Sequence, residues 1–169
     1  MLEDAARAKV ARVLDALEAT GADYKWVERE NLHVTLRFYG ERPETELPAL
    51  KEALARVARR PPFTIELSCV GAFGGMKNPK TLYLGLTKGA PELAEMAKEL
   101  GGEEKFKAHV TLGRQRSLRG LGVLTRLLAS YEFEPIVFPA DAIALVKSTL
   151  SPKGSRYEVV SQQRCQAPL

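Results

Sequence analysis

The only two histidines of the chain head the same tetrapeptide, HVTL, at residues 33–36 and again at residues 109–112. Histidine titrates near neutral pH, with an ordinary pKa of about 6.5, so a pair can hold one neutral and one protonated ring. Such a pair can act as general base and general acid on opposite sides of one reacting centre. The repeated tetrapeptide therefore favours a catalytic pair, His33 and His109, over two unrelated surface or core histidines.

The residues around each histidine suit chemistry at phosphorus. In a strand, positions i and i+2 project from one face, so Thr35 accompanies His33 and Thr111 accompanies His109. Threonine hydroxyls can donate to nonbridging oxygens whose charge grows in a transition state. The segment KFKAHVTLGRQRSLR (105–119) adds five Lys and Arg residues and no acid. An arginine there could clamp an anion with two hydrogen bonds. Base, acid, hydroxyl donors and a cation together indicate in-line displacement at phosphorus.

Competing chemistries fit the sequence less well, and we expect neither a metal nor a cofactor. A catalytic metal needs three or more ligands, while neither tetrapeptide has a carboxylate on its histidine face, and Cys69 and Cys165 have no metal spacing. We expect Cys69 to be buried in a strand and Cys165 to be a free thiol in a tail. GxSxG is absent, and GAFGGMKNPKT lacks the spacing of a P-loop, so we interpret it as a turn in which Lys77 or Lys80 could help to hold a polyanion.

Composition limits the size of the core and the cellular location, but it does not identify a partner. A chain of 169 residues with 45% apolar residues can build one core, or two small lobes that share one. The net charge of +4 permits a polyanionic partner. No apolar run has the length of a membrane span, and the N-terminus does not resemble an export signal. We therefore expect a cytoplasmic monomer with no membrane association.

Hydrophobic periodicity supplies the elements that must position these residues. Helices are expected over residues 2–19 and 44–59, from Pro91 to Leu100, and after a capping Ser117 through Leu128. Strands are expected over 31–39, 63–70, 81–86, 108–114, 135–150 with a bend near Pro139, and 156–162, the last entered through the turn SPKG.

The order of these elements repeats once, as helix, histidine strand, helix, strand, loop and strand. The two histidines are 76 residues apart, close to half the chain. An internal duplication explains both facts. The sequence therefore predicts a single domain over residues 1–169 with pseudo-symmetric lobes of about 1–80 and 81–169. Their histidine patches would face each other across a cleft.

Three ordered motifs resemble the 2H phosphoesterases, a family defined by two H-x-T-hydrophobic motifs about half a chain apart. WVERENLHVTLRFYGE (26–41) and KFKAHVTLGR (105–114) are similar to the two signatures of the bacterial and archaeal branch named for 2′-5′ RNA ligase. KSTLSPKGSRYEVV (147–160) resembles its C-terminal S-x-L-x-x-x-G-x-x-Y pattern. The resemblance implies an α+β fold, a bilobal duplication with two antiparallel sheets lining a central cleft and helices on the outside. Family members usually open with a short strand before the first helix. The chain begins inside the expected first helix, so we expect either a first sheet without that strand or a natural start further upstream.

The resemblance also implies an activity, namely metal-independent hydrolysis of an RNA 2′,3′-cyclic phosphate to a 2′-phosphate. By it, His33 is the general acid and His109 the general base. Thr35 and Thr111 contact the phosphate, and two further residues bind substrate: Arg114, and Phe38 by stacking on a base. Strand parity alone puts Arg114 and Phe38 on the face opposite the histidines, so each would need a strand end or a bulge. Phe38 could instead pack in the core.

The implied partners are RNA molecules with a 2′,3′-cyclic phosphate end, tRNA fragments among them, or cyclic nucleotides. Three alternatives stay open. The same site could run in reverse as a 2′-5′ RNA ligase, or it could act on another small cyclic phosphate. The chain could also be an RNA-end binding module without turnover.

Overall fold

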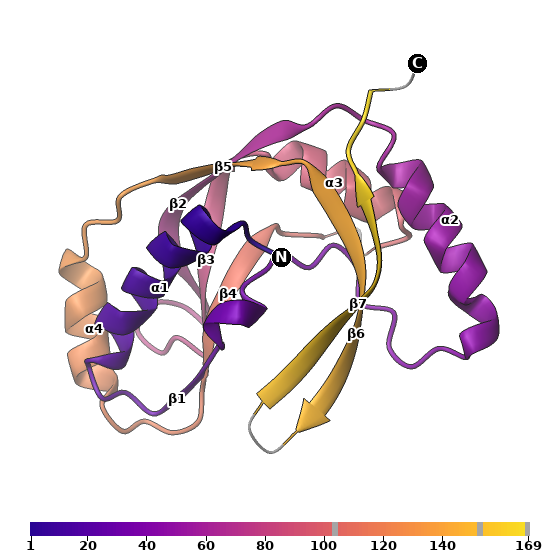
Figure 1. The fold of residues 1–169 in the computed structure, drawn as a ribbon. Helices are drawn as coiled ribbons and strands as arrows, with labels where there is room; N and C mark the ends of the chain where they lie inside the picture. Colours follow the sequence, from indigo (N-terminus) through magenta and orange to yellow (C-terminus); the bar gives the residue numbers. More distant parts are fainter. Residues whose placement is uncertain (103–104, 152–153, 168–169) are drawn as a thin grey trace. The chain divides into compact units, whose positions relative to one another are not determined.

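The computed structural model describes residues 1–102, 105–151 and 154–167 and divides into two compact units (Figure 1). The first unit comprises residues 1–34, 66–87 and 109–138, and the second comprises 35–65, 88–108 and 139–169. Each unit therefore draws segments from both halves of the sequence. The division of the sequence into lobes of about 1–80 and 81–169 stays a prediction.

The first unit is built around an antiparallel sheet. Its helices and short turn are α1 (Asp4–Glu18), η1 (Arg29–Asn31) and α4 (Leu121–Ser130). The five-stranded sheet has the order β1-β4-β3-β2-β5 and consists of β1 (Tyr24–Trp26), β2 (Phe63–Phe73), β3 (Thr81–Lys88), β4 (His109–Gln115) and β5 (Ile136–Ala140). Of these strands, residues 63–65 of β2, Lys88 of β3 and residues 139–140 of β5 belong to the second unit. β4 pairs antiparallel with both β1 and β3.

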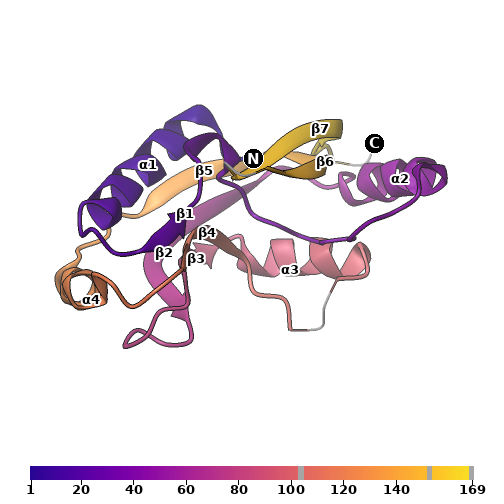
Figure 2. The same ribbon diagram turned by 90° about the horizontal axis from the view of Figure 1, so that it is seen from below.

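One face of this sheet is covered by α1. Figure 1 shows α1 in front of the strands, and in Figure 2 α1 lies above the sheet while the β2–β3 loop extends below it. The apolar positions of α1 recur at helical spacing and are buried, as are the leucines and valine of β3 and β4 that line the core: Val10, Leu14, Leu17, Leu82, Leu84 and Val110. Burial of this stripe fixes which face of β4 remains for polar side chains.

The second unit combines two helices with a hairpin. It contains η2 (Glu44–Glu46), α2 (Leu47–Val57), α3 (Ala90–Glu99), β6 (Ala142–Ser151) and β7 (Gly154–Arg164). β6 and β7 form a two-stranded antiparallel sheet against which α2 packs. An ion pair between Arg60 and Glu99, at 2.6 Å, joins the segment after α2 to the end of α3.

The predicted α+β class is confirmed, with antiparallel pairing and four α-helices among the described residues. The expected strand over 31–39 is wrong, because Val34 forms only an isolated bridge with Val110. That edge of β4 is already paired with β1 from Gly113 onward, which leaves little of it for a further strand. The predicted turn SPKG includes residues 152 and 153, which lie outside the described residues.

Two local predictions are also corrected, and one is confirmed. Ser117 does not cap α4, which begins after Gly120 in the left-handed conformation; the Ser117 hydroxyl instead donates to Asp23 at 2.6 Å. Cys69 is exposed, because its sulfur lies against Gly85, which has no side chain to cover it. Cys165 is a free thiol that follows the end of β7, as predicted; its side chain is buried, and its N–H donates to the Asp141 carbonyl.

Candidate active site

β4 carries the second histidine motif on the face of the sheet that α1 leaves open. His109 lies opposite Gly85 of β3, and Thr111 lies opposite Tyr83. Val110 points to the buried face and is fully covered, as strand alternation requires. The side chains of His109 and Thr111 are half-buried, so this part of the face remains accessible.

Two aromatic rings hold the imidazole of His109. Phe73 meets it edge-on, with ring centroids 5.2 Å apart and planes at 81°. Tyr83 meets it at 5.5 Å and 64°. The two aromatic rings also contact each other at 4.6 Å. Edge contacts of this kind are favourable and directional, so they fix the plane of the imidazole as well as its position.

Gly71 provides the space that this aromatic cluster needs. A Cβ at residue 71 would lie 2.5 Å from Cζ and 2.7 Å from Oη of Tyr83. Any side chain at this position would therefore displace the tyrosine. The close approach of strand backbone and ring explains why a glycine stands inside β2.

His33 reaches the same sheet from an irregular segment. Leu32, almost fully buried, precedes it and accepts a hydrogen bond from the Leu2 N–H at 3.0 Å. Val34, which follows it, bridges to Val110 of β4. Because this bridge is antiparallel, His33 stands at the register position opposite Thr111. Both histidines therefore belong to the first unit.

The tautomer of His33 is set by the backbone. Its Nδ1 lies 2.6 Å from the carbonyl oxygen of Asn31. A carbonyl can only accept, so Nδ1 carries a proton and donates it. In the neutral ring Nε2 is then without a proton, and it gains one only in the imidazolium form. Nε2 is consequently the nitrogen of His33 that can exchange a proton with a ligand.

The environment of His33 lowers its pKa below the ordinary value. Burial of the ring is the main cause, because it penalises the charged form. The hydrogen bond to Asn31 opposes this effect, while the positive charges of the N-terminus and of His109 add to it.

Arg114 shares the face of His109 because β4 contains a bulge. The register moves from Tyr83 opposite Thr111 to Leu82 opposite Gly113, so β4 has one extra residue at this point. Beyond the bulge Arg114 lies opposite Thr81, which is on the same face of β3 as Tyr83. The bulge that would let Arg114 share the face of the histidines is therefore present, and the Arg114 side chain is exposed.

Thr35 and Phe38 belong to the second unit. Thr35 is exposed, and the Phe38 side chain is 82% exposed, so the alternative that Phe38 packs in the core is wrong. Their contacts with substrate stay predictions. Of the two loop lysines, Lys80 donates from Nζ to Oε1 of Gln115 at 3.0 Å. This bond ties the start of β3 to the end of β4.

The sequence did not reveal the residues that surround the histidines. Phe73, Tyr83 and Gly71 come from two other strands, and their contacts with β4 depend on long-range pairing. Asn31 acts through its carbonyl, which carries no signature in its side chain. The one feature of the sequence that pointed to this cluster was Tyr83, between the buried residues Leu82 and Leu84. Because side chains alternate along a strand, Tyr83 lies on the open face.

The fold of antiparallel sheets and helices, with His109 on β4 and His33 next to the Val34–Val110 bridge to the same strand, is the arrangement expected of a two-histidine phosphoesterase. The family model described as LigT-like phosphoesterase matches residues 2–83. The chain is 34% identical to the RNA 2′,3′-cyclic phosphodiesterase of Archaeoglobus fulgidus, over 93% of this chain and 92% of that protein. It is 33% identical to the protein of the same name from Aeropyrum pernix, over 90% and 92% of the two chains.

The crystal structure of LigT from Escherichia coli without ligand has the same fold. The TM-score is 0.75 at 22% identity, over 97% of this chain and 92% of that one. The chain belongs to the LigT-like phosphoesterases, a 2H phosphoesterase family of hydrolases. Among the residues that the structure describes, no helix is long and apolar enough to cross a membrane. No group of three or more His, Cys, Asp or Glu side chains within the described ranges could hold a metal ion.

Proposed function

We propose that this protein is an RNA 2′,3′-cyclic phosphodiesterase that hydrolyses the terminal cyclic phosphate to a 2′-phosphate without a metal or cofactor. The observation that carries the proposal is His109 on β4 with His33 next to the Val34–Val110 bridge to that strand, and with the tautomer of His33 fixed by Asn31. The names of the relatives support the substrate class. Cyclic-phosphate ends of RNA, including tRNA fragments, are the expected partners, and cyclic nucleotides are minimal versions of them.

In the proposed reaction His109 is the general base and His33 the general acid. Neutral His109 accepts a proton from a water molecule, whose oxygen attacks phosphorus in line with the bond to O3′. As the P–O3′ bond breaks, Nε2 of protonated His33 donates its proton to O3′. The phosphate remains on O2′. One proton enters and one leaves the pair, so the two rings exchange protonation states in each turnover.

The negative charge of the substrate favours the protonated form of His33, which the lowered pKa of the free protein disfavours. In the free protein, burial disfavours the imidazolium that the general acid requires. A phosphodiester anion next to the ring favours that charged form, so substrate binding and protonation of His33 are coupled. Thr35, Thr111 and Arg114 would hold the nonbridging oxygens, and Phe38 would stack on the terminal base.

The test is an assay with an oligoribonucleotide that ends in a 2′,3′-cyclic phosphate, followed by identification of the product isomer. We expect a 2′-phosphate, and turnover that is unchanged in EDTA. A 3′-phosphate would refute the assignment of the leaving group, and loss of activity in EDTA would refute the metal-free mechanism. Binding without turnover would favour the alternative of an RNA-end binding module. A 2′-5′-linked product with a 5′-hydroxyl oligonucleotide would show the reverse reaction, ligation.

A further inference from the structure

Lys25 of β1 and Arg114 of β4 stand directly opposite each other in the sheet. Trp26 packs over Gly113, where an added Cβ would lie 2.6 Å from the indole ring, and its ring stacks on Tyr24 at 4.9 Å. Tyr24 and Trp26 therefore occupy the face that α1 covers, and Lys25 between them projects from the other face. That other face is the one that carries His109 and Thr111.

Two positive charges in this position are unfavourable for the fold. Like charges directly opposite in an antiparallel pair destabilise it. No acidic side chain in the described ranges forms an ion pair with Lys25 or Arg114, and both side chains are exposed. An anion between them would remove this repulsion. The arrangement is therefore better explained by a ligand than by stability.

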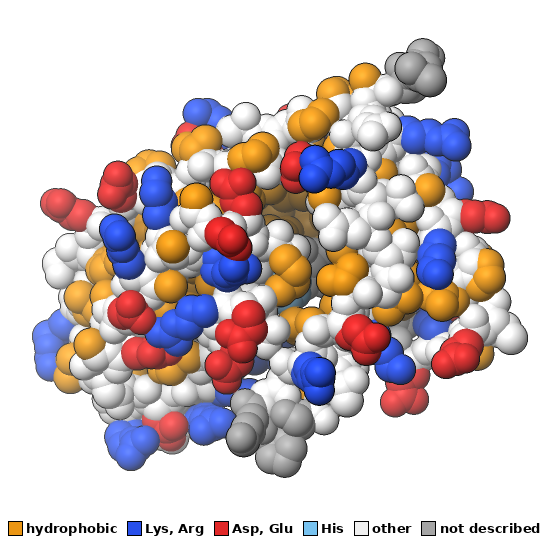
Figure 3. Space-filling model, in the orientation of Figure 1, with side chains coloured by type: hydrophobic (Ala, Val, Ile, Leu, Met, Phe, Trp, Pro, Cys, Tyr) orange, Lys and Arg blue, Asp and Glu red, His pale blue; other side chains and the backbone are white. Residues whose placement is uncertain are grey.

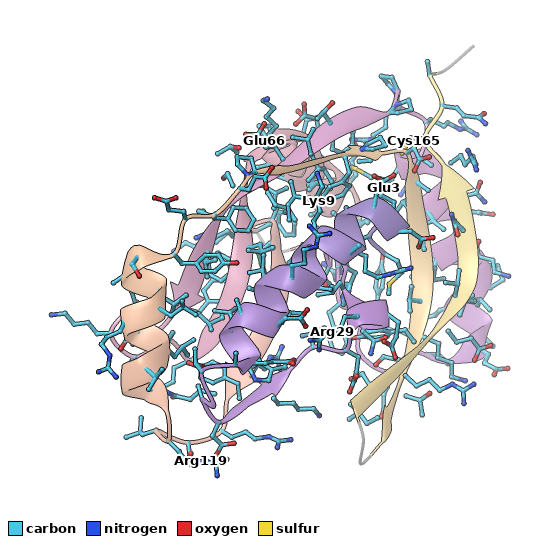
Figure 4. The ribbon with its side chains drawn as sticks, turned by 60° about the vertical axis from the view of Figure 1, so that its left-hand side comes forward. Glu3, Lys9, Arg29, Glu66, Arg119 and Cys165 are labelled. Carbon is cyan, nitrogen blue, oxygen red and sulfur yellow. The ribbon has the colours of Figure 1, made fainter. Side chains whose placement is uncertain are left out.

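The charges on the α1 face of the same unit are arranged differently. Figure 3 shows basic and acidic side chains interspersed on this side. Arg29, labelled in Figure 4, forms ion pairs with Asp15 at 2.6 Å and Glu18 at 2.8 Å. On the α1 face, basic side chains are thus neutralised by acidic neighbours, as is usual on a solvated surface. Lys25 and Arg114 have no such acidic partners among the residues that the structure describes.

The position of the pair relates it to the reacting phosphate. Arg114 pairs with Thr81 of β3, and Thr111 pairs with Tyr83 of the same strand. Because β3 lacks the extra residue of the bulge, its numbering gives the separation of these two cross-strand pairs. The two pairs are two residues apart on β3, or about 7 Å along the strand. This separation is of the size that one nucleotide of an extended RNA strand spans.

We propose that Lys25, beside Arg114, binds the phosphodiester on the 5′ side of the terminal nucleotide, and that the enzyme thereby prefers oligoribonucleotides to cyclic mononucleotides. The inference rests on the proposed function for the position of the terminal phosphate. Arg114 stands between that phosphate and Lys25, so it contributes to both sites. Lys25 contributes only to the second, because it lies on β1, beyond the histidine strand.

Two substrates that differ by one phosphodiester test the proposal: a nucleoside 2′,3′-cyclic phosphate, and a short oligoribonucleotide with the same cyclic end. In Lys25→Gln we expect KM for the oligonucleotide to rise on the order of tenfold, as for loss of one charged hydrogen bond. We expect kcat/KM for the mononucleotide to stay within twofold. The salt dependence of oligonucleotide binding should become shallower by about 0.7 in log–log slope, the value for one phosphate contact on a single strand.

Lys9→Gln is the matched control, because Lys9 projects from α1 and removes the same charge at a distance (Figure 4). It should change neither substrate's kinetics nor the salt slope. Equal losses with both substrates in Lys25→Gln, or no loss with either, would overturn the inference while leaving the hydrolytic function intact. Binding of an oligonucleotide with a 3′-phosphate end separates the two claims. A Lys25-dependent Kd for this ligand, together with no hydrolysis of the oligonucleotide that ends in a cyclic phosphate, would support the anion site and refute the proposed activity.

Discussion

Replacing Gly71 with alanine tests whether the aromatic cluster positions His109. The added methyl carbon would lie 2.5 Å from Cζ, 2.6 Å from Cε2 and 2.7 Å from Oη of Tyr83. Carbon atoms in optimal contact are about 3.5–4.0 Å apart, so the ring must move by about 1 Å. Gly71 does not have a positive φ, so the substitution introduces a steric conflict without backbone strain.

The displaced tyrosine can move only at the expense of its neighbours. Tyr83 is 6% exposed and contacts both Phe73 and His109. Overpacking of this kind costs about 1–3 kcal/mol, which corresponds to a decrease of a few degrees in Tm for a chain of this size. A misplacement of about 1 Å at a catalytic group can cost about 100-fold in rate. We therefore expect kcat to fall about 100-fold while most of the stability remains.

The assay compares kcat and KM on a cyclic-phosphate oligonucleotide with Tm for wild type, Gly71→Ala and a second glycine variant. Gly122→Ala is the control, because Gly122 is exposed on α4 and an added Cβ would meet only the end of the Arg126 side chain at 3.8 Å. This helical substitution should raise stability by up to about 1 kcal/mol and leave kcat unchanged. A folded Gly71→Ala enzyme with wild-type kcat would show that Tyr83 does not position the imidazole. A loss of kcat that only follows the loss of folded protein would show the same.

Three further predictions concern the histidines. His33→Ala and His109→Ala should each lower kcat by about 10²–10⁴-fold with little change in the affinity for RNA, and an equal loss of affinity would contradict proton transfer as their main role. The alkaline limb of each pH profile reports loss of the proton from His33, the general acid. This limb should lie at lower pH for kcat/KM than for kcat, because burial lowers the pKa of His33 in the free enzyme and the bound phosphate raises it. Coincident alkaline limbs would contradict this coupling. Because that pKa is lowered on folding, His33 should stabilise the fold above about pH 6.5 and lose this contribution as the pH falls through the folded value. Urea unfolding at pH 7 and pH 5 should therefore show a smaller pH difference for His33→Gln than for wild type.

The sequence predicted those features of the site that depend on local pattern. Apolar spacing located the four helices, and the alternation of HVTL correctly put Val110 in the core with His109 and Thr111 on the open face. The same alternation failed for residues 31–39, because pattern shows which residues prefer a strand but not whether a partner edge is available. There β1 occupies the edge of β4, and His33 is held by a single bridge at Val34.

The residues that support the histidines could not be predicted, because they depend on register between distant strands. Tyr83 faces His109 only because β3 pairs with β4 in the observed register, and Phe73 joins them from β2. A shift of one residue would turn Tyr83 to the buried face. Gly71 looked like an ordinary loop glycine, whereas its role lies in the ring that it accommodates.

The bulge in β4 gives the spacing of the second motif a physical meaning. On a regular strand the residues that share a face with His109 and Thr111 would be Gly113 and Gln115, and Arg114 would point into the core. One extra residue turns Gly113 toward Trp26, where only a glycine fits, and returns Arg114 to the open face. The guanidinium thereby reaches the histidine face one step beyond Thr111. A histidine, a hydroxyl and an arginine at i, i+2 and i+5 thus form one face only where a bulge lies between the last two. The glycine before the arginine is therefore as much a part of the motif as the residues that contact the phosphate.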